Sequence, residues 1–359
     1  MKKLILRQLF LAALLLPFSC TNGDKIEGPG PSGGGNPTSD QWLIPQDNVL
    51  DGGPGKDGIP ALDAPDFIEI DQVDFLDDDD LIIGFKVGNE VRGYPHPILD
   101  WHEIINDELG NTRVAITYCP LTGTGIGWNR DLSTGTTTFG VSGLLYNTNL
   151  IPYDRGTDSN WSQMLLEAVQ GKMAGTAIET YQVLETSWGT WKELYSSSKI
   201  VSTNTGWNRN YDRYPYGDYR SNNNSLFFPV AINDDRLPSK ERVLGVISST
   251  KAAKAYRFSH FPATGIGVLS DTFRENNLIL IGSQEHNFIM AFQQPAGLTF
   301  EAVQGQLPIS MRDNEGNLWN IFGEAVSGPR VGQRLEATRS FIGYWVAWGA
   351  FYEGLDIYE

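Results

Sequence analysis

Cys119 is the residue of this chain that is best placed to do chemistry. It follows residues 114–118, whose alternating pattern predicts a strand, and it precedes residues 120–125, a turn whose glycines let another group approach closely. A thiol at a strand end, next to exposed backbone amides, can have a lowered pKa and act as a nucleophile or a metal ligand. The alternative is that Cys119 is a small, buried and inert side chain.

A histidine near this thiol would complete the site, because an imidazole can serve as a base or as a ligand for a metal ion. His102 is the first candidate partner, followed by His286 and then by His96 and His260. Glu103 and His286 are expected as secondary contacts. The alternative is that His102 is a hydrogen-bonded residue of the core.

The leading hypothesis is therefore a site in which Cys119 is a ligand or nucleophile and His102 is a ligand or base. Such a site would bind copper or another soft metal, with Cys119, His102 and His286 as ligands, or would carry out single-thiol redox chemistry. No spacing in the chain matches a known metal-binding signature, so the hypothesis depends on position rather than on a motif. The sequence leaves open whether the protein is an enzyme.

A short helix is expected to carry His102. Pro97 suits the first helical position, and Ile98, Trp101, His102 and Ile105 recur at helical spacing. The pattern places these four side chains on one face, so His102 is expected to point with its apolar neighbours toward the protein interior.

The chain repeats itself at an offset of about 160 residues, which indicates an internal duplication. In one copy residues 151–155 precede Trp161, and in the other residues 309–313 precede Trp319 at the same distance. Short alternating runs, broken by Gly, Asn and Asp, fill both copies. The sequence therefore predicts a mainly β fold made of two homologous, strand-rich halves with a few short helices.

The two copies differ where their polar residues lie. Ser283 aligns with Cys119 and His286 aligns with Thr122, and residues rich in helix breakers stand where the first copy has its helix. Such divergence is expected when one copy of a duplicated scaffold carries a site and the other supports it.

The N-terminus has the pattern of a secretory signal. Three basic residues lie between Lys2 and Arg7, an apolar run covers residues 9–16, and a small residue precedes Cys20. The run is about half the ~20 residues that a membrane span needs. We expect a lipoprotein signal in which Cys20 is lipidated and becomes the mature N-terminus. A plain signal peptide with an incidental Cys20 is the alternative.

Lipidation of Cys20 would have two consequences. The lipid on Cys20 would anchor the protein, through a tether rich in Gly and Pro, to membrane lipid in the cell envelope, at the outer membrane or the surface of a Gram-negative bacterium. Cys119 would also lack a disulfide partner, because the chain has 2 cysteines. The expected organisation is a signal peptide at 1–20, a tether at 21–56, a first half at 57–200, a connecting loop at 201–239 and a second half at 240–359.

Composition narrows the choice of partners. A net charge of -16 with 27 basic residues argues against nucleic acid, whose phosphates need Lys and Arg. Residues 77–80 are consecutive aspartates, which predict a solvated turn rather than a calcium loop, because a calcium loop spaces its oxygens around a glycine.

The connecting segment supports a second hypothesis. Its aromatic and Asn-rich part, from Trp207 to Tyr219, would form an ordered loop or lid that binds glycan or peptide without catalysis. Cys119 would then be a core residue. A purely structural role in the envelope is the third alternative.

Several motifs together resemble the bacterial and archaeal family called domain of unknown function 3179, over residues 57–351. The motifs are Trp101-His102-Glu103-Ile104, Thr117-Tyr118-Cys119-Pro120-Leu121, Phe139-Gly140-Val141-Ser142-Gly143 and Tyr153-Asp154-Arg155. The resemblance implies redox or soft-metal chemistry at the family's Cys-Pro-Leu-Cys motif, with Cys119 as its first cysteine and His102 as its helix histidine. Thr122 stands where the family has its second cysteine, so dithiol cycling within the motif is not expected here.

Overall fold

The computed structural model describes residues 40–359, so the predicted signal peptide and its Cys20 lie outside the described residues. Strands dominate, at 41% of residues against 9% in helices, which confirms the mainly β fold class. Short alternating runs separated by Gly, Asn and Asp favour such strands. In the part of the chain that the structure describes, no helix is long and apolar enough to cross a membrane.

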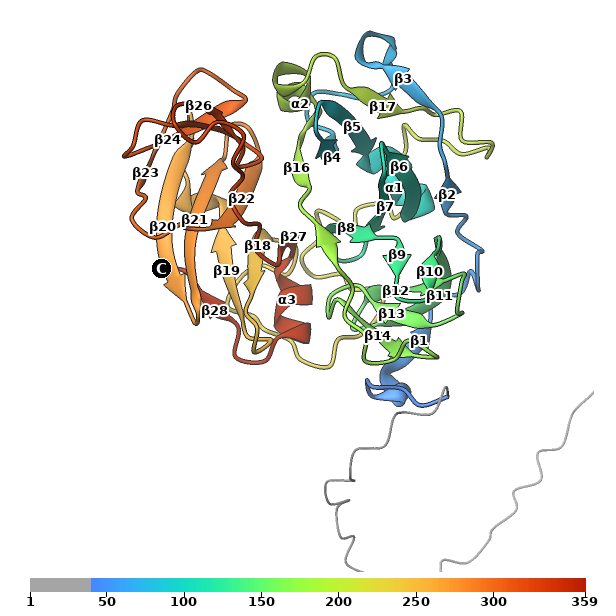
Figure 1. Cartoon of the computed structure of the whole chain (residues 1–359). Helices are drawn as coiled ribbons and strands as arrows, with labels where there is room; N and C mark the ends of the chain where they lie inside the picture. Colours follow the sequence, from blue (N-terminus) through green and yellow to red (C-terminus); the bar gives the residue numbers. More distant parts are fainter. Residues whose placement is uncertain (1–39) are drawn as a thin grey trace, which may run out of the picture. The chain divides into compact units, whose positions relative to one another are not determined.

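The first half contains three sheets and one small hairpin (Figure 1). Neighbouring strands pair antiparallel, except that β17 runs parallel to β5 and β2 runs parallel to β6. One sheet consists, in order, of β16 (Leu184–Ser187), β4 (Leu81–Val87), β5 (Glu90–Pro95), β17 (Lys199–Val201) and β3 (Phe67–Glu69). A second consists of β15 (Thr180–Tyr181), β8 (Thr124–Asn129), β7 (Thr112–Cys119), β6 (Ile104–Leu109) and β2 (Leu62–Asp63). The third consists of β1 (Val49–Asp51), β11 (Phe139–Tyr146), β12 (Asn149–Asp154), β13 (Asn160–Ser162) and β14 (Glu167–Gln170), and the hairpin pairs β10 (Gly135–Thr136) with β9 (Asp131–Leu132).

The second half contains three smaller sheets with the same order of pairing. In Figure 1 its strands are grouped together in yellow to red. In order across each sheet they are β27 (Ser340–Tyr344), β18 (Arg242–Ile247), β19 (Ala253–Arg257) and β28 (Asp356–Ile357); β20 (Gly267–Phe273), β21 (Asn276–Ser283) and β22 (Phe288–Gln293); and β23 (Phe300–Ala302), β24 (Ile309–Asp313), β25 (Leu318–Asn320) and β26 (Ala325–Ser327). Strands β6, β7 and β8 of the first half thus correspond in order to β20, β21 and β22.

A tryptophan packs against a strand glycine at equivalent places in the two halves. Trp191, in α2 (Trp188–Leu194), lies on Gly84 of β4, and Trp348, in α3 (Trp345–Phe351), lies on Gly245 of β18. A Cβ at Gly84 would lie 2.0 Å from the Trp191 ring, and one at Gly245 would lie 2.3 Å from the Trp348 ring. Only glycine leaves room for the indole rings at these two strand positions.

The predicted helix that carries His102 is α1 (His96–His102), and it is shorter than expected. Glu103 follows it with a φ of 56°, and Ile105 lies in β6, so the expected place of Ile105 on the helical face was wrong. The helix ends here because the next residues pair with β7. The N–H of Tyr118, for example, donates to the carbonyl oxygen of Glu103 at 2.6 Å.

The predicted tether is structured from residue 40 onward. Strand β1 pairs with β11, and the N–H of Leu43 donates to the carbonyl oxygen of Val169 at 2.8 Å. Ile44 packs in a small apolar cluster with Ile151 and Val169, and this burial explains why the segment is ordered. The structure also contains 3-10 helices at Gln46–Asn48, Ile70–Gln72 and Phe258–His260, and the last of these stands where the first half has α1.

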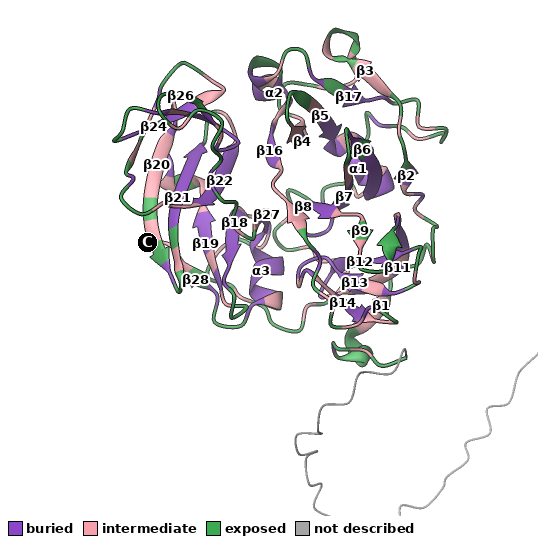
Figure 2. Ribbon diagram, viewed as in Figure 1, coloured by how far each residue is buried: buried purple, intermediate pink, exposed green. Residues whose placement is uncertain are grey.

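Apolar burial is continuous between the two halves. Figure 2 shows buried residues along β18, β21 and β22 and in α3. One apolar cluster combines Ile82, Leu184, Trp188 and Trp191 of the first half with Ile279, Phe288, Phe292 and Trp319 of the second. Three ion pairs also join the halves: Lys86 with Glu324, Glu185 with Arg242 and Lys251 with Glu167, each at 2.6 Å.

Candidate functional site

The turn that follows Cys119 is held by both halves of the protein. Strands β7 and β8 pair so that Cys119 lies opposite Thr124, and the N–H of Thr122 donates to the carbonyl oxygen of Cys119 at 3.2 Å. The N–H of Tyr344, from β27, donates to the carbonyl oxygen of Thr122 at 2.7 Å. Gly123 has a φ of 57° and lies against the Tyr344 ring, so both the turn and this contact favour glycine.

The thiol of Cys119 is buried and neutral. The residue is 1% exposed, and its Sγ lies 3.9 Å from the carbonyl oxygen of Thr148. Burial, with a smaller contribution from the Glu103 carboxyl, raises the pKa of Cys119 to about 11. This shift is opposite to the lowered pKa that the sequence predicted. The thiolate that a nucleophile or a metal ligand requires is therefore disfavoured at neutral pH.

His102 is fully buried, and both of its ring nitrogens bind other groups. Nδ1 lies 2.7 Å from the carbonyl oxygen of Pro60, and Nε2 lies 2.7 Å from Oη of Tyr211. Because a carbonyl can only accept, Nδ1 carries the proton and Nε2 accepts from the Tyr211 hydroxyl. Burial also lowers the pKa of His102, which favours the neutral ring. One of these hydrogen bonds would have to break before His102 could take a proton from Cys119 or bind a metal ion.

The third predicted ligand, His286, lies in the turn between β21 and β22. Its N–H donates to Oγ of Ser283 at 3.0 Å, and its carbonyl oxygen accepts from Oγ1 of Thr186 at 2.5 Å. Among residues 40–359, no group of three or more His, Cys, Asp and Glu side chains is arranged to hold a metal ion. The structure therefore does not bring Cys119, His102 and His286 together as a ligand set.

Three buried ionisable residues instead gather on α1 and just after it. His96, Asp100 and Glu103 are 4%, 3% and 7% exposed. Burial raises the pKa of Asp100 and that of Glu103 to about 8. Nε2 of His96 lies 3.5 Å from Oε2 of Glu185, the carboxylate that pairs with Arg242. Asp100 was missed from the sequence, although a carboxylate between the apolar residues of a buried helix is unusual and was a usable signal.

Lys240 is a further buried group that the sequence did not reveal. It is 7% exposed, and its Nζ has no hydrogen-bond partner within residues 40–359. Nζ lies 3.3 Å from the centre of the Tyr219 ring, which is a cation–π contact. Burial lowers the pKa of Lys240 to about 8. Lys240 is flanked in the sequence by the polar residues Ser239 and Glu241, and this polar run does not predict that its side chain is buried.

The connecting segment is an ordered loop that packs on α1 and on the Cys119 turn. Tyr211 binds His102, as described, and Oη of Tyr219 donates to the carbonyl oxygen of Leu121 at 3.0 Å. Trp207, at the other end of the aromatic part, is 51% exposed. Tertiary hydrogen bonds from the tyrosines therefore hold this loop against the first half.

An apolar cavity of about 410 Å³ lies beside the Cys119 turn. Leu121 follows Cys119 in that turn, and the N–H of Leu150 donates toward the thiol. Glu103 supplies the ionisable group of the lining, and Oη of Tyr216 lies 3.5 Å from its Oε1. The lining consists of Gly52, Pro54, Ile59, Glu103, Leu121, Val141, Gly143, Leu144, Leu145, Leu150, Tyr216, Phe227 and Phe228.

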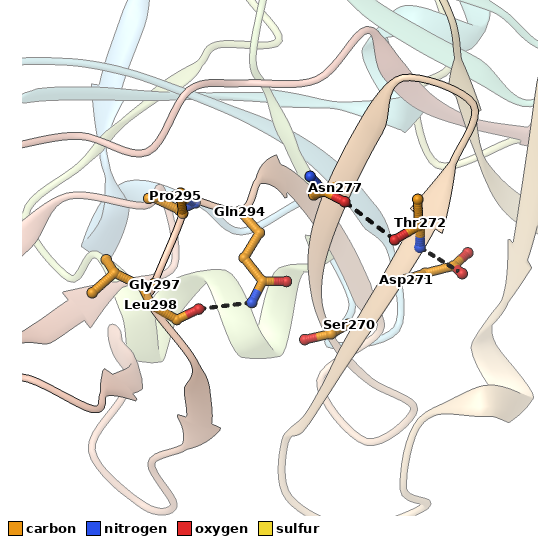
Figure 3. Close-up of a pocket in the computed structure, with 9 residues that line it drawn as sticks. Ser270, Asp271, Thr272, Asn277, Gln294, Pro295, Gly297 and Leu298 are labelled. Carbon is orange, nitrogen blue, oxygen red and sulfur yellow. Dashed lines mark hydrogen bonds between the residues drawn. The ribbon is translucent and has the colours of Figure 1, made fainter.

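A larger cavity, of about 590 Å³, lies in the second half and is lined by polar groups that bind one another (Figure 3). Nε2 of Gln294 donates to the carbonyl oxygen of Leu298 at 2.7 Å, and Oγ1 of Thr272 donates to Oδ1 of Asn277 at 3.2 Å. Asp271 in this lining pairs with Lys254. Because these polar groups are already satisfied, we place the candidate site at the Cys119 cavity despite its smaller volume.

Comparison with known proteins identifies the family. No curated protein and no solved structure matches the chain. The model of the family described as "Protein of unknown function (DUF3179)" matches residues 56–354, most of the described part of the chain. The chain therefore belongs to the DUF3179 family.

Proposed function

We propose that this protein binds a mostly apolar small molecule in the cavity beside Cys119, as a non-catalytic binding protein of the cell envelope. The observation that supports the proposal is an apolar lining that contains one buried carboxyl, that of Glu103. Ligand pockets are typically apolar with a few polar groups that orient the ligand. Burial of hydrocarbon in such a lining contributes about 25 cal/mol per Å² of surface removed from water.

The Glu103 carboxyl would select among apolar ligands. Its pKa of about 8 favours the protonated acid at neutral pH, so its O–H can donate to an oxygen of the ligand. Tyr216 adds a second hydroxyl next to it. A buried polar group that is left unpaired costs about 1–3 kcal/mol, so a ligand with an acceptor oxygen is favoured over a pure hydrocarbon.

This proposal keeps the binding hypothesis drawn from the connecting segment but changes the ligand. Tyr216 lines the cavity, whereas Trp207 lines a different one. The lining is apolar, which favours a hydrophobic molecule over a glycan or an extended peptide. Lipid anchoring through Cys20, predicted from the signal sequence, would hold the cavity near a membrane, where apolar molecules are concentrated.

Soft-metal binding or single-thiol redox chemistry at Cys119 and His102 stays a prediction. Either function requires the thiolate, and metal binding by His102 also requires the loss of a hydrogen bond to Pro60 or Tyr211. Titration with copper(I) under reducing conditions, with Cys119→Ala as the control, tests this prediction. Stoichiometric binding that depends on Cys119 would favour it over the proposal made here.

Fluorescence titration with N-phenyl-1-naphthylamine, a neutral probe that fluoresces in apolar sites, tests the proposed function. We expect saturable binding to the wild-type protein. Leu145→Phe adds a ring to the cavity lining and should weaken binding at least about tenfold. Leu132→Phe makes the same change at a partly buried residue outside this lining and should leave binding unchanged. Equal binding by the two variants would contradict the proposal.

Competition for the probe tests the role of Glu103. 1-Decanol should displace the probe at a roughly fivefold lower concentration than decane, because only the alcohol can accept a hydrogen bond from Glu103. Glu103→Leu removes the carboxyl at similar size and should remove this preference. Thermal unfolding of the variant confirms that it folds. A preference for decanol that survives the substitution would rule out Glu103 as the selecting group.

A further inference from the structure

An acidic cavity of about 350 Å³, distinct from the two described above, borders α1. Arg220 is the one cationic residue of its lining. The lining carboxyl groups are those of Asp74, Asp77, Asp80, Asp100 and Asp212, and we call the cavity the acidic pocket. The pocket includes two aspartates of the 77–80 run, which forms a turn closed by a hydrogen bond from Asp80 N–H to Asp77 O at 2.9 Å.

Two polar groups of the acidic pocket are buried without a partner. Asp100 is 3% exposed, and its Oδ1 accepts no hydrogen bond within residues 40–359. The hydroxyl of Tyr214, in the same lining, is also buried and unpaired in the described part of the chain. Such groups are rare in folded proteins and cost about 1–3 kcal/mol each. A ligand that reaches Asp100 and Tyr214 would satisfy both groups.

We propose that the acidic pocket binds an organic ammonium ion, with Asp100 as its buried counter-ion. The carboxylates at the exposed Asp74, Asp77 and Asp212 would attract a cation into the pocket. A protonated amine also supplies N–H donors, which match the unpaired Oδ1 of Asp100.

Aromatic residues favour an organic cation over a metal ion. Phe75, Tyr211 and Tyr214 line the acidic pocket, and aromatic faces attract ammonium groups. The guanidinium of Arg220 already lies 4.6 Å from the centre of the Tyr214 ring, so this lining accepts a cation. In residues 40–359 no three acidic side chains converge as a metal ion would require. The volume of about 350 Å³ also fits a small organic molecule.

Isothermal titration calorimetry with propylammonium chloride tests the proposal, because the probe is fully charged at about pH 9. We expect saturable binding to the wild-type protein and at least about tenfold weaker binding by Asp100→Asn, which keeps the shape but removes the counter-ion. Asp79→Asn removes the same charge at an exposed aspartate outside the lining and should change affinity less than about twofold. Arg220→Gln removes the competing cation and should strengthen binding.

The pH dependence provides a second readout. Asp100 must lose its proton to pair with the ammonium, so affinity should rise from about pH 6 to about pH 8 and then level off. The groups that act on Asp100 are Asp80, Glu103, Arg220 and the hydroxyls of Tyr118, Tyr214, Tyr216 and Tyr344. Asp100→Asn should therefore remove most of the pH dependence, while Tyr214→Phe should keep it and weaken binding several-fold.

Three outcomes would overturn the proposal. The first is no detectable binding of propylammonium to the wild-type protein. The second is equal loss of binding in Asp100→Asn and Asp79→Asn, which would indicate attraction by surface charge alone. The third is binding of calcium chloride, and not of propylammonium, that depends on Asp100. None of these outcomes involves the Cys119 cavity, so the proposed function would be unaffected.

Discussion

At the scale of single residues, burial rather than a neighbouring base controls the Cys119 thiol. His102, the expected base, binds Pro60 and Tyr211. The pKa of Cys119 is raised from 9.0 to about 11, mainly by burial. This shift lowers the thiolate fraction at neutral pH about a hundredfold. The Cys119 thiol is thus held in its neutral form beside the apolar cavity.

The rate of alkylation measures the reactivity of the Cys119 thiol directly. In a Cys20→Ser protein, native Cys119 should react with iodoacetamide at least about a hundredfold more slowly at about pH 8 than the same residue in urea-unfolded protein. The lower thiolate fraction and the burial of Sγ both slow the reaction. Similar rates in the two states would show that the thiol is reactive and would support the redox hypothesis.

Asp100 and Glu103 make stability depend on pH in the direction opposite to an ordinary salt-bridged carboxylate. Burial raises their pKa from 3.8 and 4.5 to about 8. At pH values between the ordinary and the raised pKa of these two carboxyl groups, the folded protein binds more protons than the unfolded chain. The free energy of unfolding is therefore highest at the acidic end of this window and falls as pH rises toward 8.

Urea unfolding at about pH 5.5 and about pH 8 tests this dependence, which can reach roughly 1.4 kcal/mol per pH unit for each group. Asp100→Asn combined with Glu103→Gln should flatten the dependence and make the variant more stable than wild type near pH 8. If the double variant lost as much stability as wild type over this range, other groups would be responsible.

At the scale of elements, α1 links the two proposed binding sites. Asp100 lines the acidic pocket, and Glu103, directly after the helix, lines the apolar cavity. The helix is short because the chain enters β6 at Ile104 and pairs with β7. A one-turn difference in helix length would therefore move Glu103 away from the cavity, so the boundary between helix and strand positions the site.

Strands β16 and β18 bring Glu185 and Arg242 together across the two halves. Glu185 is buried, and burial alone would raise its pKa; the charges of Arg242 and then His96 nevertheless lower it. The ionised carboxylate thus depends on its partner from the other half. Nη1 of Arg242 also donates to Oδ1 of Asn287 at 2.7 Å.

Removal of one member of this pair should be costly. Arg242→Met leaves the buried Glu185 carboxylate without its guanidinium partner, and should lower the free energy of unfolding by about 3–5 kcal/mol. Arg330→Met removes the same type of residue from the more exposed pair with Glu315 and should cost less than about 1 kcal/mol. Urea unfolding measures both variants. Equal losses would show that the Glu185 pair is not a structural link.

At the scale of the whole molecule, the two halves share one order of strand pairing and an apolar cluster to which both contribute. The shared order of pairing agrees with the internal duplication predicted from the sequence, which stays a prediction. Similar hydrogen bonds occur in the two halves: Nε1 of Trp161 donates to Asp154 at 3.0 Å, and Nε1 of Trp319 donates to Asp313 at 2.9 Å. Repeated contacts of this kind preserve the scaffold while the residues around Cys119 differ between halves.

The shared core predicts cooperative unfolding. Because Trp191 of the first half packs in one apolar cluster with Ile279 and Phe288 of the second, the unfolding of either half would remove part of the other half's core. Urea transitions followed by tryptophan fluorescence and by far-UV circular dichroism should coincide. Two separated transitions would mean that the halves are independent folding units.

The sequence by itself determined the properties that depend on contiguous residues. Alternating runs and turn residues predicted the mainly β class, the motifs around His102 and Cys119 predicted the family, and the apolar spacing from Ile98 predicted α1. The helix end at His102 could not be predicted, because its cause is pairing with β7 rather than local propensity.

Only the tertiary structure decided the chemistry of the candidate site, because burial and hydrogen bonding depend on residues far apart in the chain. Tyr211, which hydrogen-bonds Nε2 of His102, lies in the connecting segment, and Cys119 is buried in an apolar cluster to which both halves contribute. The expectation of a lowered pKa for Cys119 therefore differed from the structure for one reason. Residue types and spacing show which groups could react, but their protonation and access are set by packing.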